Sequence, residues 1–230
     1  MGSKKIPGFA SPEKADEKEF PYDAAAVIAY WSALVDKGRS LKVVKEVQDS
    51  RGNPRAIKNL ADKWGPEATK HILGAREGMS SARDDVRAYW EGGAFVAFNS
   101  YVEHVLKVMD DTAEVMRSMS KLNLDVLETT VNTYNSGINF IGECAQALLS
   151  AAASVAQNLL NLVGATCSAI LEALSKFVGA VTELMIARNR SMMGYAKTGI
   201  ALKQAAINLR VPDPIPSSVG DSGNWKVGRR

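Results

Sequence analysis

The chain has 230 residues, of which 46% are hydrophobic, so it is long enough for one large core or two small ones. Its 28 basic and 25 acidic residues leave a net charge of +3, which argues against a strongly basic, general nucleic-acid binder. Aromatic residues make up only 7% of the sequence, and alanine is abundant. This composition predicts an all-α fold, in which long antiparallel helical hairpins pack as a helical bundle with few or no strands.

The first part of the chain divides into a polar leader and a set of short helices. Residues 1–20 are charged and interrupted by proline and glycine, which predicts a flexible leader. They contain no apolar stretch, so we expect no secretory signal peptide there. Over 21–65 we expect short helices, one of them beginning with Pro54 at its first position, and one Val-rich segment for which a strand is the alternative. Gly65 and Pro66 are expected to interrupt the helix that precedes them.

Residues 66–136 carry two apolar heptad patterns, one on each side of a glycine pair. In both patterns the apolar or small residues recur in steps of four and three, as they do where helices pack along one another. We therefore expect a hairpin of two long antiparallel helices that ends at 135–137. The large residues expected at the hairpin interface are Ile72, Met79, Val86, Phe98, Val102, Val105 and Met109. In the first pattern the small residues Ala68, Ala75 and Ala82 alternate with the larger ones, of which Tyr89 is the last, and this permits a close approach of the two helices.

Residues 137–210 are predicted to form an apolar helical module rich in alanine and serine. No charged residue occurs from Cys144 to Leu171. For 138–187 the sequence leaves two alternatives open: a helix buried in a bundle core, or a helix that inserts into or spans a membrane. A single continuous helix would keep Cys144 and Cys167 far apart, so we expect two buried free thiols and no disulfide.

The remaining features argue against catalysis. Residues 211–230 are rich in proline and glycine, which predicts a disordered tail. The histidines of the chain are His71 and His104, and no cysteine or acidic cluster has the spacing of metal ligands. No glycine-rich phosphate loop follows a strand. We therefore expect no enzymatic activity, no catalytic residue, no cofactor and no metal site.

The stretch between the two heptad patterns has the sequence YWEGG, residues 89–93. Glycine supplies the positive φ that ends a helix, and the indole of Trp90 is expected to fill the open end of the hairpin. A Trp-x-Gly turn between two matched helical patterns resembles the WXG-motif proteins that type VII (ESX) secretion systems export. The resemblance covers 66–136 and rests on Trp90 and Gly92, with Gly93 beside them.

The resemblance implies a helical hairpin that pairs with a second hairpin into a four-helix bundle. It also implies export in the folded state without a signal peptide. Recognition by the export ATPase would use the Trp-x-Gly turn together with a Tyr-x-x-x-Asp/Glu signal just after the hairpin. None of the six tyrosines of this chain has Asp or Glu four residues later, so the second half of that recognition surface is missing from the sequence.

Two functions follow as hypotheses. The first is a non-enzymatic, secreted or cell-surface substrate or effector of a type VII (ESX-like) system. It would act through self-association or partner binding, with membrane engagement by 138–187 as an additional option. The second is a cytoplasmic or membrane-associated helical scaffold that is not exported. The expected partners are a second copy or a second WXG-like helical protein, the secretion ATPase and, if 138–187 inserts, a membrane, but not nucleic acid.

Overall fold

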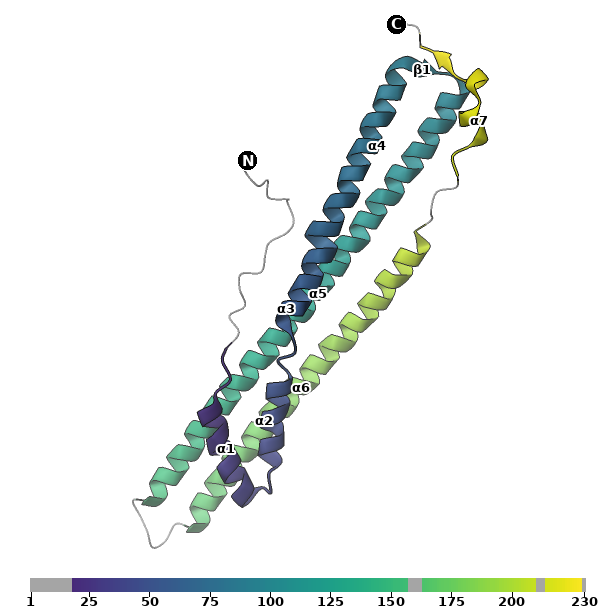
Figure 1. Cartoon of the computed structure of the whole chain (residues 1–230). Helices are drawn as coiled ribbons and strands as arrows, with labels where there is room; N and C mark the ends of the chain where they lie inside the picture. Colours follow the sequence, from purple (N-terminus) through teal and green to yellow (C-terminus); the bar gives the residue numbers. More distant parts are fainter. Residues whose placement is uncertain (1–17, 157–162, 210–213, 229–230) are drawn as a thin grey trace, which may run out of the picture. The chain divides into compact units, whose positions relative to one another are not determined.

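The computed structural model describes residues 18–156, 163–209 and 214–228, and these are mostly helical, with short connecting turns and one pair of two-residue strands (Figure 1). The fold is all-α, as the composition predicts. The helical elements are α1 (Tyr22–Val35), α2 (Arg39–Asp49), α3 (Pro54–Asp62), the π-helical segment η1 (Lys63–Ala68), α4 (Thr69–Tyr89), α5 (Gly93–Ala156), α6 (Val163–Asn208), α7 (Ser217–Gly220) and the 3₁₀ turn η2 (Ser222–Asn224). The strands are β1 (Trp90–Glu91) and β2 (Lys226–Val227).

The described residues form two compact units. The first unit combines the N-terminal residues up to Arg55 with Leu124–Gly194, and the second combines Ala56–Asn123 with the residues from Tyr195 onward. Helices α5 and α6 each contribute residues to both units. From the sequence, residues 66–136 and 137–210 are each expected to form a separate module. In the structure, each of these two ranges is divided between the two units.

The core of the first unit is built from α1, α2, the second part of α5 and the first part of α6. Its buried residues are Ile28, Val43, Val44, Val47, Ile141, Cys144, Leu148, Ile170, Leu174, Phe177, Val178 and Val181. Leu148 and Ile170, which belong to the uncharged run, thus lie in a protein core, and this supports the bundle-core alternative for the run. In the described part of the chain, no helix is both long and apolar enough to cross a membrane.

The last described residues of the predicted leader are attached to the first unit. The backbone amide of Lys18 donates to Oδ1 of Asn135 at 3.1 Å, and its ammonium group donates to Oδ1 of Asn139 at 2.7 Å. Phe20 packs against the core. Residues 1–17, over which the flexible leader is expected, lie outside the described residues.

The turn between α1 and α2 is organised by one carboxylate. Asp36 accepts hydrogen bonds from the hydroxyl groups of Ser32 and Ser40, both fully buried, and from the backbone amides of Arg39 and Ser40 at 3.0 Å. Burial alone would raise the pKa of Asp36, but these hydrogen bonds outweigh it and lower the pKa below its ordinary value. Because the carboxylate caps the first turn of α2, the Val-rich segment starts as a helix and not as the alternative strand.

Helix α5 continues far beyond the predicted end of the hairpin at 135–137, so that prediction is wrong. Gly137 lies inside the helix, where close packing against α2 leaves no room for a larger side chain. A methyl group there would lie 2.6 Å from Cγ1 and 2.9 Å from Cγ2 of Val47, so only a hydrogen fits between α5 and α2. The glycine marks a close approach of two helices and not a helix end.

The chain also passes through Gly65 and Pro66 without the predicted break. Proline has no N–H to donate and its ring would clash within a regular α-helical turn. The segment η1 has wider π-helical turns over Lys63–Ala68 and carries α3 directly into α4. The buried hydroxyl of Ser120 donates to the carbonyl of Ala61 at 2.8 Å, which holds the end of α3 against α5 within the second unit.

Candidate interaction surface at the hairpin turn

The predicted hairpin interface lies between α4 and the first part of α5 in the second unit. None of the predicted interface residues is exposed. Val102 and Val105 are buried, and the other members are half-buried, namely Ile72, Met79, Val86, Phe98 and Met109. The two helices are further joined by an ion pair in which Nε of Arg76 lies 2.6 Å from Oδ1 of Asp110.

The small positions of the predicted first pattern are not all covered by α5. Ala75 and Ala82 are exposed, as is the larger Tyr89, whereas Ala68 is half-buried. Arg76 and Arg83, which follow these alanines by one residue, are half-buried. An arginine can lay its apolar stem along a neighbouring helix while its charged group reaches water or a carboxylate. The exposure of Ala75 and Ala82 contradicts the expected close approach of α4 and α5 over these two alanines.

The turn itself has one residue that must be glycine. Trp90 is extended, with φ −127° and ψ 140°, and ends α4, while Gly92 has φ +102°, a conformation that other residues rarely adopt. The carbonyl of Gly92 then accepts from the amide of Val96 at 3.1 Å, which starts α5. Gly93 is already helical and a methyl group there would meet nothing within 4 Å, so the reversal of the chain depends on Gly92 alone.

Residues 214–228, here called the C-terminal strap, lie against this turn (Figure 1). Strand β2 pairs antiparallel with β1, with Trp90 opposite Val227 and Glu91 opposite Lys226. The amide of Gly228 also donates to the carbonyl of Tyr89 at 2.9 Å. The structure of the strap differs from the disordered tail expected over 211–230. The rest of that range, residues 211–213 and 229–230, lies outside the described residues.

The aromatic side chain at the end of the hairpin is Trp225 from the strap. Its ring lies 5.8 Å from that of Trp90, edge to face, and 6.1 Å from that of Phe98. Its indole N–H donates to the carbonyl of Val219 at 2.8 Å. Trp90, which the sequence predicts to fill this position, keeps 41% of its surface exposed and forms one wall of the site. A tryptophan followed by Lys-Val is atypical of disordered tails, and this is the signal that could have revealed the strap.

The surface around the turn exposes several large apolar side chains beside the charged Glu91 and Lys226. Apart from Trp90, it exposes Tyr89 to 55%, Val96 to 66% and Val227 to 71%. Large apolar side chains that gather at one place on a surface mark contacts with other proteins more often than chemistry. The surface is thus suited to binding a protein.

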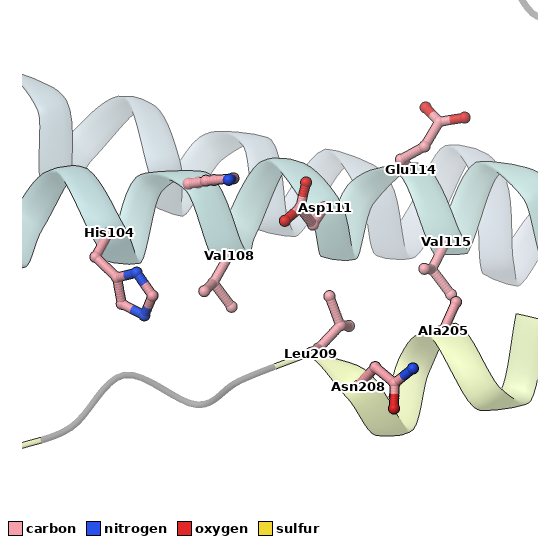
Figure 2. A pocket seen from close by; sticks show the side chains of 9 residues that line it. His104, Val108, Asp111, Glu114, Val115, Ala205, Asn208 and Leu209 are labelled. Atoms are coloured by element: carbon pink, nitrogen blue, oxygen red, sulfur yellow. The ribbon is translucent and has the colours of Figure 1, made fainter.

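A groove in the second unit does not present a set of catalytic or metal-binding side chains either. A groove of about 510 Å³ lies between α5 and the last turns of α6, and Figure 2 shows His104, Val108 and Leu209 directed toward it while Glu114 points away. Nowhere among the described residues do three or more histidine, cysteine or acidic side chains gather as metal ligands would. His71, the other histidine, is exposed on α4 and does not line this groove.

The two cysteines differ in environment, whereas the sequence predicts two buried thiols. Cys144 is buried, donates weakly to the carbonyl of Ala173 at an S–O distance of 3.9 Å, and has its pKa raised to about 12, first by burial and then by the charge of Asp36. Cys167 is exposed, so the prediction is wrong for this residue. Both are free, as expected, and no disulfide joins them.

No protein-family model matches the chain, and neither a curated protein nor a solved structure matches it. The function therefore has to be argued from the residues at the turn and their geometry.

Proposed function

We propose that this protein is a non-enzymatic substrate or effector of a type VII (ESX-like) secretion system and acts by binding a second helical protein or a second copy of itself. The observation that carries the proposal is the turn between α4 and α5. It combines an exposed Trp90 with the positive φ of Gly92, between two helices whose apolar residues face each other. The resemblance of this Trp-x-Gly turn to the WXG motif supports the assignment to type VII export.

The outer face of α4 supports the proposed binding of a second helical protein. Ala75 and Ala82 lie seven residues apart and are both exposed, and the exposed Tyr89 follows after seven more. The two small side chains would let a second helix approach closely. Trp64 lies at the start of the same helical run with 36% of its surface exposed. An aromatic residue with a large exposed surface next to such a face is typical of binding sites between proteins.

Secretion assays test the proposal. In the native host, deletion of the type VII ATPase gene is expected to abolish the extracellular protein, and Trp90→Ala is expected to do the same. Tyr30→Ala is the control, because it removes an exposed aromatic side chain from α1, which takes no part in the turn or in the exposed face of α4. Circular dichroism must show that both variants keep their helices. Unchanged extracellular protein in the ATPase deletion strain would exclude the proposal.

A helical scaffold that stays inside the cell is the alternative function. The contact between Trp90 and Trp225 favours it, because it gives Trp90 a structural partner within its own chain. In that case Trp90→Ala loses an aromatic pair that contributes about 0.5–1.5 kcal/mol. The variant would then melt at a lower temperature while its distribution between cells and medium would equal that of the native protein.

A further inference from the structure

The contacts between the strap and the hairpin turn have the character of a peptide bound to a receptor. The main chain of β2 adds to β1 as a second strand, in a register fixed by the pairs Trp90–Val227 and Glu91–Lys226. One side chain, Trp225, enters between Trp90 and Phe98. Main-chain pairing together with one anchoring side chain is how proteins bind extended peptides by strand addition.

Gly92 belongs to this contact as well as to the turn. A methyl group on Gly92 would lie 3.2 Å from the backbone oxygen of Asn224 and 3.5 Å from Cγ of Lys226, so the strap lies directly on the glycine. Gly93, its neighbour, has nothing within 4 Å of such a methyl group. The turn therefore offers a surface without a side chain at the point where the strap crosses it.

The strap keeps its conformation largely through bonds of its own. Asp221 accepts from the amide of Gly223 at 2.9 Å and from the side-chain amide of Asn224 at 3.2 Å. The indole N–H of Trp225 donates to Val219, which is another strap residue. The anchoring tryptophan is thus oriented by the strap before it meets the hairpin, which lowers the entropy that binding costs.

The attachment of the strap is small. Its strand has two residues, and a two-stranded pair of this length is at best marginally stable without further packing. Val227 and Ile215 remain largely exposed, at 71% and 49%, so few apolar contacts beyond Trp225 hold the strap. A segment with so few contacts opens at a much lower free energy than the helices it covers.

We propose that the face of the hairpin turn formed by Trp90, Gly92 and Phe98 is a peptide-binding site, that the C-terminal strap occupies it in cis, and that it accepts a tryptophan-bearing extended segment of a partner protein in exchange. The partner segment needs a tryptophan to enter between the two aromatic rings, and two following residues that continue as a strand along β1. This inference is independent of export, since it concerns binding by the purified protein.

A binding experiment with a full-length variant tests the site. In Trp225→Ala the strap loses its anchor, which leaves the site open to a fluorescent peptide with the sequence of residues 214–228. We expect this variant to bind the peptide at least about tenfold more tightly than the native chain, in which the strap competes at a high effective concentration. A peptide in which alanine replaces Trp225 is expected not to bind.

Two further variants locate the binding site. Phe98→Ala added to Trp225→Ala is expected to abolish peptide binding, because it removes one of the two rings that the tryptophan of the peptide contacts. Gly93→Ala in the same background is the control and is expected to leave binding unchanged, because a methyl group there meets nothing within 4 Å. Equal peptide binding by the native chain and Trp225→Ala, or no binding by either, would overturn the proposal.

Hydrogen exchange on the native chain provides a measurement that needs no variant. The amide of Gly228, which donates to Tyr89, is expected to exchange through local opening of the strap, many times faster than the amides of buried α5 residues such as Val102. If Gly228 exchanged only as slowly as these core amides, the strap would be a fixed part of the hairpin and the proposed exchange with a partner would be refuted.

Discussion

Replacing Gly137 by alanine is expected to destabilise the first unit, although alanine is normally the better residue inside a helix. The higher helix propensity of alanine alone would stabilise the helix by about 0.5–1 kcal/mol relative to glycine. Against this, the new methyl group would lie 2.6 Å from Cγ1 of Val47, closer than real Cβ contacts come. Val47 is fully buried and β-branched, so it has neither free space nor an easy second rotamer. Overpacking of this kind costs about 1–3 kcal/mol, so we expect a net loss of roughly 1–2 kcal/mol.

Gly142→Ala is the matched control for this experiment. It lies in the same helix, and a methyl group there would meet nothing within 4 Å, so it should gain about 0.5–1 kcal/mol. Urea denaturation followed by far-ultraviolet circular dichroism gives both free energies of unfolding. Adding Val47→Ala to Gly137→Ala removes the clashing methyl groups, so the double variant should be more stable than the sum of the single effects. If Gly137→Ala were as stable as Gly142→Ala, the close approach of α2 to α5 would not be what requires glycine.

The other predictions concern a pair of thiols, a carboxylate and a hydroxyl group. With dithionitrobenzoate at neutral pH, Cys167 is expected to react at once and Cys144 only after unfolding, because burial raises the pKa of the Cys144 thiol to about 12. Fast reaction of both thiols would contradict the buried position of Cys144. The lowered pKa of Asp36 means that its carboxylate stabilises the fold above the ordinary pKa of 3.8, and that this stability is lost as the pH falls through the lower folded-state pKa. Asp36→Asn should therefore cost about 1 kcal/mol at neutral pH, and its melting temperature should converge with that of the native protein in acid; a difference that stayed constant with pH would refute the capping role. Ser120→Ala should cost about 1–3 kcal/mol in urea denaturation, since it leaves the buried carbonyl of Ala61 without its donor, and an unchanged midpoint would show that this bond contributes nothing.

The sequence was sufficient to predict the helical class and the turn at Gly92. Both depend on local chemistry: helix propensity and heptad spacing for the helices, and the positive φ that only glycine tolerates well for the turn. The large apolar residues expected at the hairpin interface are buried or half-buried, as their spacing along one side of each helix would require.

The errors arise where a residue's role depends on a partner far away in the chain. Gly137 looks like a helix end until Val47, ninety residues earlier, is placed beside it. The alanines of α4 look like the interface from their spacing, yet Ala75 and Ala82 are exposed while Arg76 and Arg83 beside them are half-buried. The strap was missed because its composition is that of a disordered segment, while its order depends on rings contributed by the hairpin. Periodicity within one segment holds no information about such distant partners.

The interleaving of the two units also sets an order of events during synthesis. Helix α2 leaves the ribosome early with Val43, Val44 and Val47 on one face, yet part of the core that buries them, including Ile170, is translated only about 120 residues later. At roughly 5–20 residues per second, this apolar face stays uncovered for on the order of ten seconds. During that interval, neighbouring nascent chains on one polysome can associate through the exposed apolar face of α2. A chaperone that covers α2 until α6 is synthesised would raise the yield of correctly folded protein.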